Sequence, residues 1–165
     1  MMKMVLANEV HKLILENLFS LYGHDISEYT PYSEVGDDGA YAFEDVDDFL
    51  HSAEHMAFLF YQENKPIGFL LMGSGELALE GCEYIIYDFF VLRKYRRTGM
   101  GTEAMKMVFD QYPGKYCVSD LVCNVSAVSF WRKLIARYAK AGTQQIEEEF
   151  VAPTEEAFLC QIFEV

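Results

Sequence analysis

The sequence predicts a mixed α/β (α+β) protein with one mostly antiparallel sheet and helices on both of its faces. Apolar stretches with strand composition alternate with stretches in which apolar residues recur at helical spacing. An early strand-turn-strand segment precedes a strand-helix-strand segment, and together these connections indicate antiparallel and parallel neighbours in one sheet. The chain has 165 residues, of which 52% are hydrophobic, and we expect a single domain over residues 1–165.

The first half of the chain is predicted to hold two helices and a hairpin. Asn8 can cap a helix over about residues 9–21, whose apolar residues follow the helical period: Val10, Leu13, Ile14, Leu18 and Leu21. Residues 22–41 contain Pro31, Gly36 and Gly39 and are predicted to be loops with at most one short helix. Residues 46–51 form a second short helix, and residues 56–61 and 67–72 form the hairpin.

The second half is predicted to alternate strands and helices. Four segments have strand composition, at residues 85–92, 116–123, 146–151 and 157–163. One amphipathic helix begins near Met100, and another covers residues 127–138. The connection over residues 73–81 has no clear pattern.

The charge of the chain limits its partners. A formal net charge of -13 argues against nucleic acid and against an acidic membrane surface. No lysine or arginine lies between Lys12 and Lys65, a segment that holds twelve carboxylates: Glu16, Asp25, Glu28, Glu34, Asp37, Asp38, Glu44, Asp45, Asp47, Asp48, Glu54 and Glu63. Basic residues instead gather from Arg93 onward. The sequence therefore predicts an acidic end and a basic end.

Neither the cysteines nor the histidines have the spacing of a metal site. Cys82, Cys117, Cys123 and Cys160 lie in or beside apolar stretches, which predicts reduced thiols in the core. His24 is predicted to be an exposed loop residue. No signal peptide or apolar span is evident, so we expect a cytoplasmic protein.

The run Tyr95–Thr102 is the most informative part of the sequence. It joins the apolar strand at residues 85–92 to an amphipathic helix through a turn that contains Gly99 and Gly101. The first turn of a helix has backbone N–H groups without partners, and glycines let a phosphate approach them. A phosphate site is therefore predicted here, with tight packing as the structural alternative for the two glycines.

These motifs resemble the GNAT superfamily of acyl-CoA-dependent N-acetyltransferases, and the likeness covers most of the chain. The family pattern [R/Q]-x-x-G-x-[G/A] is present as Arg96-Arg97-Thr98-Gly99-Met100-Gly101. A second family motif is present as Asn124, Ala127, Phe130-Trp131 and Lys133. The resemblance implies a GNAT-like fold and acetyl-CoA as the co-substrate, with no metal.

The resemblance also implies which residues bind coenzyme A. Backbone amides over Arg97, Thr98, Gly99, Met100, Gly101 and Thr102 would hold the pyrophosphate, and Arg96 would begin that loop. Val91 would pair its backbone with the pantetheine arm, and Asn124 would lie near that arm, where two strands diverge. Trp131 would pack on the coenzyme, although core packing explains it equally well. Arg93, Lys94 and Arg132 are candidates for the other phosphate or for ordinary surface residues.

Acetyl transfer to an amine requires a group that accepts the proton of the amine, because a free amine with a pKa near 10 is mostly protonated at neutral pH. Asp88 is the one carboxylate inside the apolar run 85–92, and a charge buried there is either functional or paired. Glu83 and Tyr87 are weaker alternatives. Trp131 stands where many members of the family have a tyrosine that protonates the leaving thiolate, and indole cannot do this.

The sequence thus predicts an N-acetyltransferase that acts on a primary amine, with a cationic small molecule or peptide as acceptor. The acidic segment between Lys12 and Lys65 motivates the cationic acceptor. A non-catalytic acyl-CoA-binding sensor or interaction protein with the same fold is the alternative. An edge strand near the C-terminus is compatible with a homodimer.

Overall fold

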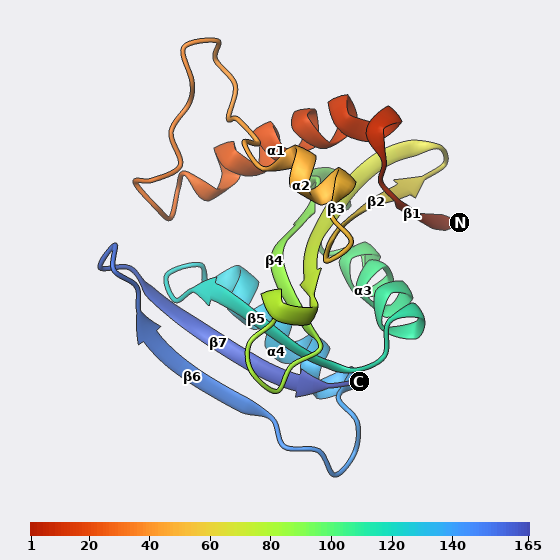
Figure 1. Cartoon of the computed structure of the whole chain (residues 1–165), viewed down its shortest axis with the longest axis vertical. Coiled ribbons are helices and arrows are strands. Elements are labelled where there is room, and N and C mark those ends of the chain that lie inside the picture. The colour runs from red at the N-terminus through yellow and green to blue at the C-terminus, as the bar shows by residue number, and fades with distance from the viewer. The chain divides into compact units, whose positions relative to one another are not determined.

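The computed structural model describes residues 1–165. Its seven strands form one sheet in the order β1-β2-β3-β4-β5-β7-β6 (Figure 1). The chain divides into two compact units. The first unit comprises Met1–Met72 and Asp88–Ala104, and the second comprises Gly73–Tyr87 and Met105–Val165. No helix has both the length and the hydropathy to cross a membrane.

The first unit holds the N-terminal strands and helices. In chain order its elements are β1 (Met2–Leu6), the 3-10 helix η1 (Glu9–His11), α1 (Lys12–Ile26), α2 (Val46–His51), β2 (His55–Gln62) and most of β3 (Lys65–Ser74). β1 pairs antiparallel with β2 from Met2 opposite Gln62 to Leu6 opposite Phe58. α2 contacts both α1 and β2, and Figure 1 shows a long loop in orange between the two helices.

The core of the first unit lies between its helices and strands. Leu15 and Leu18 of α1 and Phe49 of α2 pack with Leu59 of β2 and Phe69 of β3. Burial of such side chains contributes about 1.5–3 kcal/mol each to stability.

The later elements are β4 (Tyr84–Val91), the 3-10 helix η3 (Arg93–Tyr95), α3 (Met100–Gln111), β5 (Lys115–Leu121), α4 (Val125–Tyr138), β6 (Ile146–Val151) and β7 (Ala157–Glu164). In the second unit β4 pairs parallel with β5, and β7 pairs antiparallel with both β5 and β6. A further 3-10 helix, η2, covers Gly75–Leu77. The mixed sheet that the sequence predicts is therefore present.

β6 is an edge strand of the sheet, since β7 is its one neighbour in the strand order. Its central residues Glu147, Glu148 and Glu149 are all exposed, and so are Phe150 and Val151. Phe150 stacks on Phe158 of β7, with ring centroids 5.5 Å apart.

Two elements differ from the sequence prediction. β1 is absent from the prediction, in which the first residues have no strand. The predicted first helix ends at residue 21, whereas α1 continues to Ile26. Gly23 lies inside this helix and is buried. A Cβ built on it would overlap the side chain of Tyr41, so only glycine fits at this contact. Gly23 thus serves packing and does not end the helix.

Some predicted core residues are on the surface. Val10, Leu13 and Leu21 are exposed, whereas Leu18 is buried as predicted together with Leu15, which the prediction did not include. The prediction of four core thiols is also wrong for Cys123, which is exposed, whereas Cys117 is buried and Cys82 and Cys160 are half-buried. All four are free cysteines.

Candidate active site

The junction between β4 and α3 lies in the first unit. β4 ends at Val91, and the chain then passes through η3 and a short turn into α3. Two residues of this turn have a left-handed backbone, Arg97 with φ 61° and Gly99 with φ 90°. The carbonyl of Gly99 accepts the N–H of Glu103 at 2.9 Å, so the helical hydrogen bonds begin here.

This geometry leaves donors at the start of α3. The N–H groups of Met100, Gly101 and Thr102 precede the first helical hydrogen bond and have no acceptor within the helix. A Cβ built on Gly99 would meet no atom within 4 Å, so the turn has open space around that position. The positive end of the helix dipole adds to these donors, and the arrangement suits an anion such as a phosphate.

The side chain of Arg96 folds back onto the end of β4. Its Nε donates to the carbonyl oxygen of Val91 at 2.6 Å, and its guanidinium carbon lies 5.3 Å from the ring centroid of Phe90. Its Nη2 also donates to Asp25 on α1. Arg96 therefore shapes the loop through its side chain and leaves the phosphate donors to the backbone.

Asp25 holds two arginines beside this loop. Arg93 reaches its carboxylate with Nη2 at 2.6 Å and Nε at 2.9 Å, and Arg96 binds the other carboxylate oxygen. Burial alone would raise the pKa of Asp25, but the hydrogen bonds from Arg93 and Arg96 hold it below its ordinary value. The last turn of α1 is thus tied to the residues that follow β4. The sequence gives no signal for this contact, since the partners are about 70 residues apart.

Asp88 lies on β4 and is half-buried. The hydroxyl of Tyr22 on α1 donates to its Oδ1 at 2.5 Å. Burial raises the pKa of Asp88 above the ordinary range for an aspartate, and the hydrogen bond from Tyr22 partly offsets this. A carboxyl group with a raised pKa is suited to exchange protons near neutral pH. Sequence reasoning singled out Asp88 but missed Tyr22, because the predicted helix ended one residue before it.

The weaker alternatives to Asp88 lie in the second unit. Glu83 accepts a hydrogen bond from the backbone N–H of Lys115 at 2.6 Å, a contact between the start of β4 and β5. Burial raises the pKa of the Tyr87 hydroxyl, so this group stays protonated at neutral pH. Glu83 therefore has a structural contact, and Tyr87 has no means of accepting a proton.

The residues of the second predicted motif lie on α4 in the second unit. The Asn124 side chain caps this helix by accepting the N–H of Ala127 at 3.2 Å. Trp131 is buried, with its ring 5.3 Å from that of Phe130. Their roles in coenzyme binding stay predictions, and core packing is visible for Trp131.

The basic residues proposed for the other phosphate have protein contacts. Arg93 binds Asp25, and Arg132 binds Glu147 of β6. Lys94 lies 5.6 Å from the ring centroid of Tyr95. Of the three, Lys94 is the one that forms no ion pair with a carboxylate in the structure.

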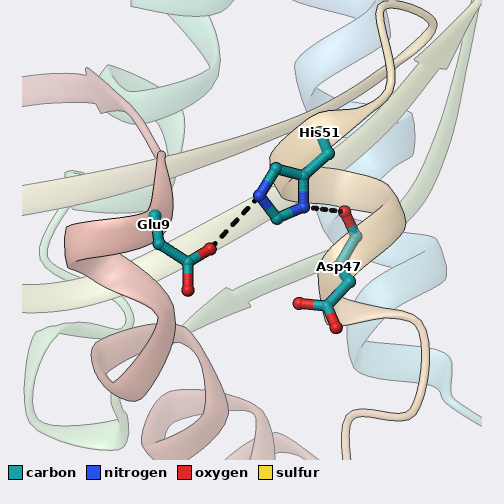
Figure 2. Close-up of side chains that lie close together, drawn as sticks. All are labelled: Glu9, Asp47 and His51. Carbon is teal, nitrogen blue, oxygen red and sulfur yellow. Dashed lines mark hydrogen bonds and ion pairs between the residues drawn. The ribbon is translucent and has the colours of Figure 1, made fainter.

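One cluster of possible metal ligands occurs outside this site, at Glu9, Asp47 and His51 (Figure 2). His51 Nε2 lies 3.3 Å from Glu9, and its Nδ1 is 3.0 Å from the backbone oxygen of Asp47. Lys12 already binds the Asp47 carboxylate at 2.6 Å. All three cluster residues are exposed, and the ion pairs of Glu9 and Asp47 account for the arrangement without a metal.

Comparisons with known proteins agree with the predicted resemblance. Solved structures with this fold include a GNAT-family acetyltransferase from Streptococcus agalactiae, 12% identical, with a TM-score of 0.74 over 99% of this chain and 95% of that one. The ribosomal-protein-S18-alanine N-acetyltransferase of Escherichia coli is 9% identical, with a TM-score of 0.63 over 100% and 94%.

A third structure contains the coenzyme. It is a protein from Bacillus anthracis named as a streptothricin acetyltransferase, in complex with acetyl coenzyme A, 15% identical, with a TM-score of 0.54 over 72% of this chain and 67% of that one. At identities this low the structural likeness shows the fold alone, and it confirms the predicted fold class. The search of curated protein sequences found no match.

The remaining comparison concerns the sequence itself. The model of the acetyltransferase (GNAT) family matches residues 18–135, which include the C-terminal part of α1, β4, the phosphate-type turn and most of α4. Acetyl-CoA is the co-substrate of this family. Because the match covers well over half of the chain, this protein belongs to the acetyltransferase (GNAT) family.

Proposed function

We propose that this protein is an N-acetyltransferase that moves an acetyl group from acetyl-CoA to a primary amine. The observation that carries this proposal is the turn between β4 and α3. Arg97 and Gly99 have a left-handed backbone there, and the N–H groups at the start of α3 have no helical acceptor. A pyrophosphate is the anion that the family would place at such a turn.

The coenzyme is proposed to lie along the end of β4 as well. The carbonyl oxygen of Val91 accepts one hydrogen bond from Arg96, and a carbonyl oxygen can accept a second. An amide of the pantetheine arm is therefore still able to pair with this residue. Arg96 would contribute by fixing the shape of the loop, and Asn124 and Trp131 are proposed coenzyme contacts from α4.

Asp88 is proposed to be the base of the reaction. The amine nitrogen attacks the thioester carbonyl carbon, the new C–N bond forms and the C–S bond breaks. The proton of the nitrogen passes to the Asp88 carboxylate, whose pKa is raised by burial. A base with a raised pKa accepts this proton more readily than an ordinary aspartate does.

The leaving thiolate needs no acid from Trp131. A thiol with a pKa of about 8.5 leaves as thiolate at a cost of about 2 kcal/mol at pH 7, by the rule of 1.36 kcal/mol per pH unit. The thiolate can therefore leave without an acid from the protein, and solvent protonates it afterwards.

A cationic acceptor is proposed because of the acidic segment between Lys12 and Lys65. Ten of its twelve carboxylates are exposed, the exceptions being Glu16 and Asp25. All of them belong to the first unit, which also holds Asp88 and the phosphate-type turn. Such a surface raises the local concentration of cations and speeds their encounter with the site.

Release of free coenzyme A thiol from acetyl-CoA, measured with a panel of amines, tests the proposal. The panel contains polyamines, lysine-bearing peptides, neutral amines and anionic amino acids. Thiol release that depends on one amine class, with the acetylated product seen by mass spectrometry, supports the enzyme. Tight acetyl-CoA binding without transfer to any amine supports the non-catalytic sensor instead.

A further inference from the structure

The contact between Tyr22 and Asp88 joins α1 to β4 inside the first unit. Tyr22 donates its hydroxyl proton to Asp88 Oδ1 at 2.5 Å, across 66 residues of sequence. Tyr22 is the one side chain that hydrogen-bonds this carboxylate in the structure. The second carboxylate oxygen, Oδ2, therefore has no hydrogen bond from the protein.

Aromatic rings fix the position of the Tyr22 ring. Its centroid lies 5.8 Å from that of Phe69 on β3 and 6.0 Å from that of Phe90 on β4, and both contacts are edge-to-face. Phe19, one turn earlier on α1, lies 5.6 Å away. These neighbours are apolar, and a hydrogen bond to a charged group is stronger in less polar surroundings.

The helix that carries Tyr22 is also fixed. Asp25 lies three residues further along α1, and residues three apart share a helix face. Its carboxylate binds Arg93 and Arg96, which directly follow β4. One face of α1 therefore contacts β4 at Asp88 and the residues just beyond the end of β4, and both contacts favour a position of Tyr22 next to Asp88.

We propose that Tyr22 is a positioning residue that orients the Asp88 carboxylate and stabilises its charged form. Its O–H occupies Oδ1, and the remaining oxygen, Oδ2, is turned to the amine and receives its proton. The amine keeps its lone pair for the attack on the thioester carbon. This inference rests on the proposed role of Asp88 as the base.

The elements next to β4 in the first unit carry few titratable or charged groups, and Tyr22 is the one of them that contacts the Asp88 carboxylate. α1 contributes Tyr22 and Asp25, and the residues after β4 contribute Arg93 and Arg96, which are bound to Asp25. β3 contributes Phe69, which has no charge. Burial raises the pKa of Asp88, and the Tyr22 hydrogen bond opposes this. Without the hydroxyl, the pKa of Asp88 should rise further.

The direct test measures this pKa without any reaction. The aspartate carboxyl carbons are labelled with 13C and titrated by NMR in the parent protein and in Tyr22→Phe, with Asp88→Asn to assign the signal. We expect the titration midpoint of Asp88 to move upward by about one pH unit. An unchanged or lower midpoint overturns the inference.

A matched control variant is Tyr116→Phe. Tyr116 is a fully buried tyrosine of β5 whose hydroxyl donates to the carbonyl of Tyr112 at 2.5 Å, so this variant also loses a short internal hydrogen bond. We expect the Asp88 midpoint to stay at the parental value in Tyr116→Phe. A shift of equal size in both variants would show a general effect of lost packing and overturn the inference.

A second substitution covers the case in which Tyr22→Phe fails to fold. 3-Fluorotyrosine at position 22 keeps the ring and makes the hydroxyl a stronger donor, so it should move the Asp88 midpoint downward. A midpoint that stays or rises with 3-fluorotyrosine contradicts the inference. The opposite signs expected for the two substitutions separate tuning by the hydroxyl from a loss of structure.

The kinetic test separates this inference from the proposed function. In Tyr22→Phe, the acidic limb of the kcat/KM profile should move upward with the NMR midpoint, and the KM for acetyl-CoA should stay at the parental value. Acetyl transfer with an unmoved acidic limb overturns the role of Tyr22 but leaves the acetyltransferase intact. Absence of transfer to every amine removes the proposed function, and with it the role of Tyr22 as a positioning residue in catalysis, even where the NMR midpoint moves.

Discussion

Arg93 places its guanidinium Nη2 2.6 Å from a carboxylate oxygen of Asp25, which joins the residues after β4 to the last turn of α1. Arg96 binds the same carboxylate and also the carbonyl of Val91. A single aspartate therefore links a helix to the start of the loop that is proposed to bind the coenzyme. The shape of this loop depends on residues that lie far from it in the sequence.

Replacement of Asp25 by asparagine should destabilise the protein. The variant leaves two arginines beside a neutral amide, and we expect a loss of about 2 kcal/mol in the free energy of unfolding. Urea unfolding at neutral pH measures this loss. Asp47→Asn is the matched control, since Asp47 forms an exposed pair with Lys12 and should change the stability little. Equal losses in the two variants would contradict the special role of Asp25.

The pH dependence of the same variant has a defined sign. The pKa of Asp25 is lower in the folded protein than in the unfolded chain, so its contribution is present above the unfolded pKa of about 4. That contribution is lost as the pH falls through the folded pKa. The stability difference between the parent and Asp25→Asn should therefore shrink in acid.

Asp88→Asn should abolish most of the acetyl transfer and leave acetyl-CoA binding intact. The amide keeps the shape of the carboxyl group but cannot accept the proton of the amine, and we expect kcat to fall by about 100-fold or more. Steady-state kinetics and calorimetry measure the two effects separately. Parental turnover across the neutral pH range would mean that Asp88 is structural.

The stability of Asp88→Asn gives a control that needs no substrate. Because burial raises the folded pKa of Asp88, the parent loses stability as the pH rises from about 4, the unfolded pKa, through the folded value. The asparagine variant lacks this loss. Unfolding measured at a series of pH values should show the stability of the variant rising relative to that of the parent as the pH increases over this range. A stability difference that does not change with pH would argue against a raised pKa.

Gly99→Ala should weaken acetyl-CoA binding by about tenfold or more, because a methyl group would point into the space where the phosphate is proposed to lie. Calorimetry measures the affinity. Gly142→Ala is the matched control: Gly142 has φ 84° against 90° for Gly99, and a Cβ at either position meets no atom within 4 Å. Both variants incur similar backbone strain, so a loss of affinity in Gly99→Ala alone locates the ligand at the turn.

The acceptor preference should depend on salt. Cationic amines should have the highest kcat/KM at low ionic strength, and this advantage should shrink at high salt as the Debye length falls below its physiological value of about 8 Å. Initial rates for a polyamine and a neutral amine of similar size, at two salt concentrations, measure the effect. A neutral amine that is preferred at both concentrations would exclude a role for the acidic segment.

The sequence predicted the sheet and most elements because their signals are local. α2 and β6 have the predicted bounds, and the predicted turn between β4 and α3 contains Gly99, whose backbone is left-handed. β1 was missed because five residues at a sheet edge give too short a pattern, and their partner β2 lies more than 50 residues later. The predicted first helix ends before α1 does, and the packing of the buried Gly23 against Tyr41 gives no local signal in the sequence.

The candidate site was predictable only where its residues give a local signal in the sequence. Asp88 is conspicuous as a charge within an apolar strand, and the Arg96 to Gly101 pattern is contiguous. Tyr22 and Asp25 contact residues 66 to 71 positions away, so no local pattern reveals them. The exposed face of α1, with Leu13 and Leu21, shows that helical periodicity alone does not identify the buried side.

The glutamates of β6 have a consequence for how copies of this protein meet. The outer edge of β6 offers unpaired backbone groups to any other extended chain. A second copy added antiparallel along this edge would bring Glu148 and Glu149 against the same residues of the other copy, and like charges directly opposite repel, whereas Glu147 is already paired with Arg132. These charges on β6 therefore disfavour the pairing of a second copy with this edge of the sheet. Replacement of Glu148 and Glu149 by glutamine would remove this repulsion, and self-association along this edge should then increase.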